Sequence, residues 1–151
     1  MENNSLLDVQ HLSHMFHLKR KMTVKAIDDV SFQIKKGEIY GLVGESGSGK
    51  STVARCIMNI YKPSEGEIFY KGIPICKSKE FRKNRKMLQM TRQMIFQDSA
   101  SSLNPRMKIE DIVAEPLRIY SGKGRPGKKE IEKQLELVGL DRSYMEKYPC
   151  E

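Results

Sequence analysis

The residues with the clearest chemistry lie in one stretch, residues 44–51, which reads GESGSGKS. It matches the phosphate-binding pattern G-x-x-x-x-G-K-[S/T]. Its glycines let backbone N–H groups approach phosphate oxygens where a β-carbon would intrude. Lys50 brings a positive charge to the β- and γ-phosphates, and Ser51 offers a hydroxyl to Mg²⁺, which prefers oxygen ligands. The predicted nucleotide-binding residues are Gly44, Glu45, Ser46, Gly47, Ser48, Gly49, Lys50 and Ser51.

The elements on either side of this loop fit the same chemistry. Residues 38–43 are mostly apolar and predict a strand that runs into the loop. Apolar residues recur at helical spacing over residues 50–61 and predict a helix that starts at the loop. The N-terminus of such a helix adds a partial positive charge of about half a unit. A strand before the motif and a helix after it are the context that nucleotide binding requires.

Further elements follow from the same patterns. Strands are expected over residues 6–12, 26–35 and 67–75, the last interrupted by a turn at Lys71 and Gly72, and a buried strand is expected over residues 93–97. Helices are expected over residues 79–91 and 108–120, and in a segment that carries Ile131, Leu135 and Val138 and ends at Gly139. The pattern changes at a loop, residues 98–107. We therefore predict a mixed α/β nucleotide-binding core over residues 1–97 and a partial helical subdomain over residues 98–151.

Composition excludes several protein classes. The chain has 151 residues, 38% of them hydrophobic, and contains no apolar run long enough to span a membrane. The N-terminus lacks the basic and apolar regions of a secretory signal. The three cysteines, Cys56, Cys76 and Cys150, form neither an even set nor a C-x-x-C pair, so reduced thiols in a cytosolic protein are expected.

The net charge of +8 comes largely from two basic runs, residues 77–86 and 122–129. Basic runs can attract nucleic acid, which would be an alternative role. Only Phe81 supplies an aromatic ring for base stacking within the first run. Solvated surface is the preferred interpretation, and no nucleic-acid partner is predicted.

Several segments together resemble a known family. These are VGESGSGKST, then PSEGEI after the predicted helix, then MIFQDSASSLNPRM and AEPL. They resemble the ATP-binding subunit of ABC transporters, and more closely the subfamily that imports oligopeptides, dipeptides or nickel. The resemblance runs over the whole chain. It implies an α/β fold, a P-loop NTPase (RecA-like) core with an antiparallel β portion, followed by the beginning of an α-helical subdomain, and thus an incomplete domain.

The resemblance also assigns roles to single residues. Gln97 occupies the position of the glutamine that helps to bind Mg²⁺ and the attacking water, so the metal ligands would be Ser51 and Gln97. Phe16 falls where the family places an aromatic ring on adenine, although a hydrophobic loop anchor is an alternative role. Thr52 would contact the α-phosphate. The implied cofactors are ATP and Mg²⁺.

The sequence departs from the family after Tyr148 and Pro149. Family members continue with a histidine, the LSGGQ signature and an apolar strand that bears an aspartate and the catalytic glutamate. Here Cys150 stands at the histidine position, and none of these motifs occurs in the 151 residues. The family is an ATPase, but the resemblance assigns no catalytic residue to this chain. We therefore expect ATP binding without efficient hydrolysis.

The resemblance implies a subunit of an oligopeptide or dipeptide importer that couples ATP binding and hydrolysis to transport. The implied partners are transmembrane permease subunits, a second ATPase subunit and, indirectly, an extracellular solute-binding protein. Its location would be cytoplasmic, on the inner face of the membrane. The alternatives are the ATPase subunit of a nickel importer and a non-catalytic, nucleotide-binding short form.

Overall fold

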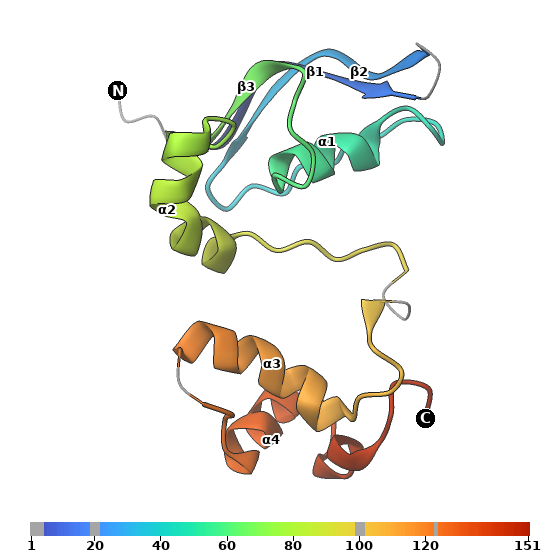
Figure 1. Cartoon of the computed structure of the whole chain (residues 1–151), viewed down its shortest axis with the longest axis vertical. Helices are drawn as coiled ribbons and strands as arrows, with labels where there is room; N and C mark the ends of the chain where they lie inside the picture. The colour runs from blue at the N-terminus through green and yellow to red at the C-terminus, as the bar shows by residue number, and fades with distance from the viewer. Residues whose placement is uncertain (1–4, 19–21, 99–101, 123) are drawn as a thin grey trace. The chain divides into compact units, whose positions relative to one another are not determined.

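The computed structural model describes residues 5–18, 22–98, 102–122 and 124–151 of the chain (Figure 1). The chain divides into two compact units, Met1–Gln93 and Met94–Glu151. The division predicted from the sequence, between residues 97 and 98, lies four residues further along the chain.

The first unit contains a four-stranded antiparallel sheet in the order β2-β1-β3-β4. Its strands are β1 (Ser5–His17), β2 (Thr23–Lys35), β3 (Glu65–Tyr70) and β4 (Ile73–Pro74). The predicted antiparallel β portion is therefore confirmed. β1 is longer than predicted because β2 pairs with it as far as His17. A strand with a continuous ladder partner keeps its backbone hydrogen bonds satisfied over its whole length.

Two helices complete the first unit, α1 (Lys50–Ile57) and α2 (Ser78–Thr91). α1 ends four residues before its predicted end, because Asn59 adopts a left-handed backbone conformation with φ of 58°. Asparagine tolerates this conformation better than most residues and often ends a helix. α2 agrees with its prediction: Leu88 is fully buried and Phe81 packs against the core.

The hydrophobic core of this unit lies between the sheet and the two helices, and α1 runs along one side of the sheet (Figure 1). Its buried members come from all of these elements and from the connections between them. They are Leu7, Val9, Leu12, Ile27, Val53, Cys56, Ile68, Tyr70, Ile75 and Leu88. This packing fixes the axis of α1 and therefore the direction of its N-terminus.

Two predicted strands are wrong. Residues 38–43 and 93–97 form no strand in the described part of the chain. Three of their apolar side chains face solvent instead: Ile39 is 99% exposed, Val43 93% and Ile95 90%. Apolar composition favours a strand, but a strand forms only where a neighbouring segment completes its hydrogen-bond ladder. Neither segment has such a neighbour among the strands described.

The second unit is helical, with α3 (Ile109–Ser121), α4 (Lys128–Leu137) and the 3₁₀ helix η2 (Arg142–Glu146). Its core consists of Ala114, Ile131, Leu135 and Met145. Both helices predicted in this region are confirmed, and α3 accommodates Pro116. Val138, expected on the apolar face, is 71% exposed because α4 ends at Leu137. Residues 99–101 of the predicted loop lie outside the described residues.

No described helix combines the length and the apolar character that crossing a membrane requires.

The three cysteines are free thiols in very different surroundings. Cys56 is completely buried, and this burial raises the pKa of its thiol to about 11, with a smaller contribution from Cys76. Burial also raises the pKa of Cys76, which is half-buried, whereas Cys150 is exposed. Since the thiolate is the reactive form, alkylation rates should follow exposure and thiolate fraction together.

We predict that iodoacetamide at pH 8 labels Cys150 first, Cys76 more slowly, and Cys56 only after unfolding. At that pH a thiol of pKa 11 is about one part in a thousand thiolate. Mass mapping of the labelled peptides measures the order, and rapid labelling of Cys56 in the folded chain would contradict it. Because the folded pKa of Cys56 is raised, its contribution to stability is complete below pH 9 and declines between about pH 9 and pH 11.

Candidate functional site

The phosphate-binding loop, residues 44–51, joins an extended segment to the first turn of α1. The first hydrogen bond of the helix runs from the N–H of Val53 to the carbonyl of Gly49, over 2.9 Å. The N–H groups of Lys50, Ser51 and Thr52 precede this bond and open toward the end of the helix. No acidic residue lies in the first turn. The end of α1 is therefore electrostatically suited to an anion.

Lys50 folds back over the loop. Its Nζ donates to the carbonyl of Gly44 at 2.7 Å, to the carbonyl of Glu45 at 2.6 Å and to the hydroxyl of Ser48 at 3.1 Å. A backbone hydrogen bond from the N–H of Ser48 to the carbonyl of Glu45 closes the turn. The ammonium group is thus held at the loop by neutral acceptors, and no carboxylate of the described residues forms an ion pair with it. Its charge remains available to a phosphate.

Gly49 is the cap of α1 and packs against β2. Its φ is 92°, in the left-handed region. A β-carbon at this position would collide with the backbone carbonyl oxygen of Ala26. The sequence requirement for glycine here has a physical cause in addition to the approach of a phosphate: the loop passes directly against the strand.

The other residues predicted for this site divide by exposure. Ser46, Gly47 and Ser51 are exposed, so the hydroxyl of Ser51 is accessible to a cation at the end of the helix. Thr52 is buried on the side of α1 that faces the core. Its backbone N–H is therefore better placed for a phosphate than its side chain.

Phe16 lies on β1 and pairs with Val24 of β2. Val24 is two residues from Ala26, the residue of β2 that lies against Gly49. Two residues along a strand correspond to about 7 Å. The ring is half-buried and packs edge-on against His14 and Tyr61, at centroid distances of 4.7 and 5.4 Å. Alternation along the strand places residues 14 and 16 on one face, a signal that could have identified His14 from the sequence.

Gln97 belongs to the other unit, Met94–Glu151, and its side chain is exposed. The structure places the phosphate-binding loop and Phe16 in the first unit. The metal-binding role of Gln97 remains a prediction.

Arg92 holds the opposite end of α1, and sequence reasoning missed it. Its Nη1 donates to the carbonyl of Ile57 at 2.5 Å and to Oδ1 of Asn59 at 3.0 Å. The guanidinium also lies 5.6 Å from the centre of the Tyr70 ring. Burial lowers the pKa of Arg92. A cation at the C-terminus of a helix is favourable, so α1 is anchored at both ends.

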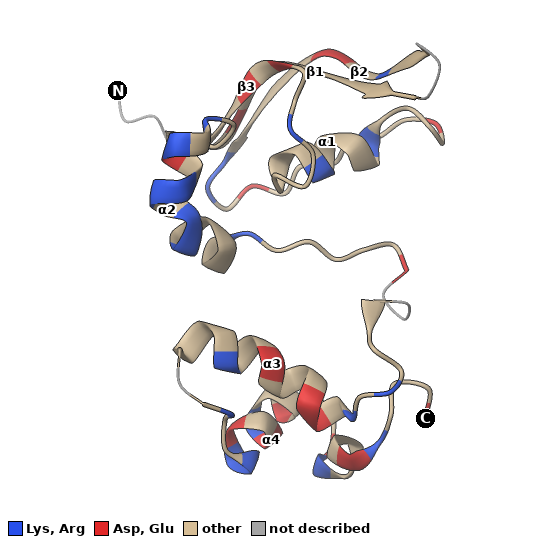
Figure 2. Ribbon diagram, viewed as in Figure 1, with Lys and Arg blue, Asp and Glu red and all other residues tan. Residues whose placement is uncertain are grey.

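The basic run on α2 is a solvated surface in this structure (Figure 2). Its exposed cations are Lys79, Arg82, Lys83, Arg85 and Lys86. Phe81, the aromatic residue within the run, packs against the core and is not free to stack on a base.

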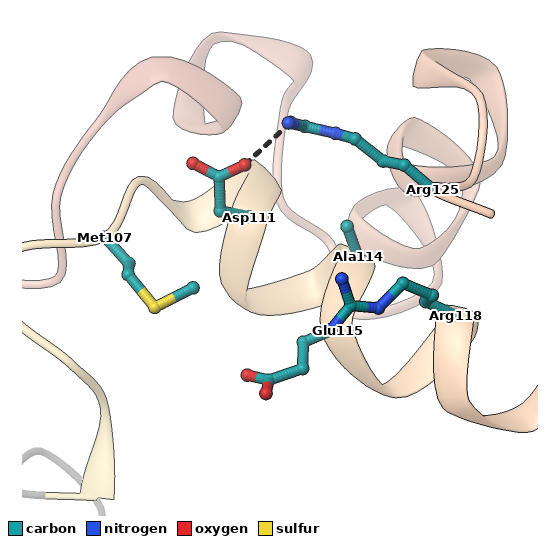
Figure 3. A pocket seen from close by; sticks show the side chains of 6 residues that line it. All are labelled: Met107, Asp111, Ala114, Glu115, Arg118 and Arg125. Carbon is teal, nitrogen blue, oxygen red and sulfur yellow. Dashed lines mark ion pairs between the residues drawn. The ribbon is translucent and has the colours of Figure 1, made fainter.

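The helical unit carries a shallow pocket of about 260 Å³ that the sequence did not predict (Figure 3). The residues that line it are Met107, Asp111, Ala114, Glu115, Arg118 and Arg125. Arg125 Nη2 lies 2.7 Å from the Asp111 carboxylate. The lining also contains one further carboxylate, Glu115, and one further guanidinium group, Arg118, so the pocket has no excess of positive charge to attract a polyphosphate.

Several curated proteins are similar to this chain over nearly all of its length. The chain is 42% identical over 156 residues to the putative oligopeptide transport ATP-binding protein YkfD of Bacillus subtilis, covering 100% of this chain and 46% of that protein. It is 46% identical over 154 residues to the oligopeptide transport ATP-binding protein OppF of the same organism, covering 97% and 48%. The chain therefore spans about half the length of the curated relatives it matches.

A solved structure supports the fold. The chain superimposes on the dimeric ATP-binding cassette MJ0796, described as bound to ADP and Pi, with a TM-score of 0.73 and 24% identity. The match covers 95% of this chain and 62% of that one. The predicted fold class is confirmed by this likeness, which at this identity concerns the fold alone.

The family model for the ABC transporter matches residues 27–150, which include most of β2, the phosphate-binding loop, α1, α2, β3, β4 and the helices of the second unit. The chain belongs to the ABC transporter family.

Proposed function

We propose that this chain is the nucleotide-binding part of an ATP-binding subunit that serves oligopeptide import. The observation that carries the proposal is the loop at the start of α1. There, open N–H groups and an ammonium group that donates to three neutral oxygens lie at the same end of the helix. This arrangement fits a triphosphate, which is polyanionic and accepts many hydrogen bonds.

Within this proposal, Lys50 and the N–H groups at the start of α1 bind the β- and γ-phosphates, and Thr52 lies beside the α-phosphate. Ser51 supplies a hydroxyl oxygen to Mg²⁺, and Gln97 supplies an amide oxygen. The fit of Ser51 rests on its exposed position in the first helical turn and on the preference of Mg²⁺ for oxygen. Phe16 stacks on adenine. Mg²⁺ would neutralise phosphate charge when bound.

The proposed transport role is supported by the printed names of the relatives, which are oligopeptide transport ATP-binding proteins. A dipeptide transport ATP-binding protein of Lactococcus lactis is 39% identical over 157 residues, so the proposed substrate class is short peptides. The proposed partners are membrane permease subunits and a second ATP-binding subunit, with the chain on the cytoplasmic face of the membrane.

For the 151-residue chain we propose binding without efficient turnover. Phosphoryl transfer requires a group that orients the attacking water and further charges around the γ-phosphate. The loop supplies one ammonium group and backbone donors, but the family resemblance assigns no general base to these residues.

The proposal predicts saturable binding of MgATP to the chain with phosphate release at the rate of the buffer alone. Calorimetric titration measures binding, and a phosphate assay measures turnover. Tripolyphosphate should compete, since it presents the same anion, whereas adenosine should compete only weakly. A folded chain that shows no saturable binding would contradict the nucleotide role, and Lys50-dependent turnover would contradict the lack of hydrolysis.

A further inference from the structure

Three rings gather where β1 meets the turn after α1: His14, Phe16 and Tyr61, hereafter the ring cluster. His14 and Tyr61 are nearly parallel, with centroids 5.4 Å apart and planes 4° apart. Phe16 is perpendicular to both, at 85° to His14 and 87° to Tyr61. The three rings are separated by similar centroid distances, so His14 and Tyr61 lie on the same side of Phe16. These two rings leave the opposite side of Phe16 uncovered.

The neighbours of Phe16 are themselves fixed. His14 is 8% exposed, and its Nδ1–H donates to the carbonyl of Lys62 at 3.1 Å. The guanidinium of Arg55, on α1, lies 5.8 Å from the centre of the Tyr61 ring. The hydroxyl of Ser64 accepts a hydrogen bond from the N–H of Met15 at 3.0 Å. Two hydrogen bonds therefore tie the turn after α1 to β1 beside the ring cluster.

The ring cluster and the phosphate-binding loop share the same framework. β1 carries Phe16, and the partner strand β2 abuts the loop at Gly49. α1 joins the loop at its N-terminus to Tyr61 beyond its C-terminus. One helix and one strand pair thus connect the two places where a nucleotide would be held.

We propose that His14 and Tyr61 are positioning residues that fix the plane of Phe16, so that its uncovered side receives the adenine base. The inference rests on the proposed nucleotide-binding function. An aromatic ring held edge-to-face by two neighbours loses little conformational freedom when a base stacks on it. Without those neighbours the Phe16 ring would lose conformational freedom when the base binds, and this entropy loss would weaken the affinity for ATP.

The test compares ATP with tripolyphosphate, which has no base. Tyr61→Leu should weaken ATP binding about threefold to tenfold, the range expected from losing one aromatic pair. Its affinity for tripolyphosphate should not change, and Tyr61→Phe should bind ATP as the unsubstituted chain does. The matched control is Tyr144→Leu in the other unit, where Lys147 lies 4.4 Å from the ring centre. It should alter neither affinity.

A double-mutant cycle with Phe16→Leu shows whether Tyr61 acts through Phe16. Phe16→Leu alone should weaken ATP binding about fivefold or more, and Tyr61→Leu should add no further loss in that background. Additive losses would overturn the proposal, as would an equal loss of tripolyphosphate affinity in a folded Tyr61→Leu chain.

If Tyr61→Leu fails to fold, His14→Asn carries the same comparison, because its amide can still donate to the Lys62 carbonyl while the ring is removed. Unchanged ATP affinity in folded His14→Asn would then overturn the proposal. If ATP binding is normal in the ring variants but still depends on Lys50, only this inference fails. If ATP binding does not depend on Lys50, the proposed function itself fails.

Discussion

Lys50→Ala should weaken MgATP binding by about 100-fold. A charge-assisted hydrogen bond to a phosphate contributes about 1.5–3 kcal/mol, and each 1.4 kcal/mol corresponds to a factor of ten in affinity. In the structure the Lys50 ammonium is held by two carbonyls and one hydroxyl. None of these acceptors carries a charge, so a phosphate oxygen is a stronger partner for it. Calorimetric titration of the variant with MgATP measures the loss.

Lys79→Ala is the matched control, because it removes the same charge from the exposed face of α2. Its effect on ATP affinity should be small, since separated surface charges are screened by salt. Circular dichroism should show both variants folded, because the acceptors of Lys50 lie in an exposed loop and can be solvated by water. Equal affinity losses in the two variants would show that net charge, not the position of Lys50, governs binding.

The antiparallel sheet and most helices could be predicted because their signals are local. Val30, Phe32 and Ile34 alternate with polar residues and pack partly buried against the core on β2. Leu88 recurs at helical spacing and is completely buried. In these elements, the residues that set the pattern also make the contacts that stabilise the element. An element that packs against segments close to it in sequence can be predicted without knowing what distant parts of the chain do.

Residues 38–43 and 93–97 show the limit of such reasoning. Ile39 and Ile95 are as apolar as any core residue, yet 99% and 90% exposed. A strand of a parallel sheet depends on partners distant in sequence, and its own composition does not reveal whether those partners are present. The error in the predicted end of α1 had a different cause. The left-handed conformation of Asn59 ends the helix before Pro63 does.

The candidate site was predictable where chemistry dictates spacing, and less so where packing does. The pattern of residues 44–51 marks the loop because phosphate binding needs those glycines and that lysine. No comparable motif marks Arg92 or Tyr61. Arg92 contacts the end of α1, and Tyr61, in the turn after α1, contacts Phe16 on β1, so both depend on segments distant in sequence. The reason why Gly49 must be glycine also involves such a contact, with β2.

Gly49→Ala should lower the free energy of unfolding by more than about 3 kcal/mol. A non-glycine residue in an unfavourable left-handed conformation costs about 1–3 kcal/mol, and φ at Gly49 is 92°. The added β-carbon would also collide with the carbonyl oxygen of Ala26, a backbone atom of β2 between the residues that pair with His14 and Met15, so relief would require moving the strand or the start of α1. Urea unfolding followed by circular dichroism measures the loss, and ATP affinity should fall with it.

Gly47→Ala separates the two causes, because φ there is 83° but no atom lies within 4 Å of the added carbon, so only the backbone cost of about 1–2 kcal/mol applies. If both variants lost the same stability, the contact between the loop and β2 would not explain the glycine, and the anchoring of α1 against the sheet would have to be attributed to its buried face alone.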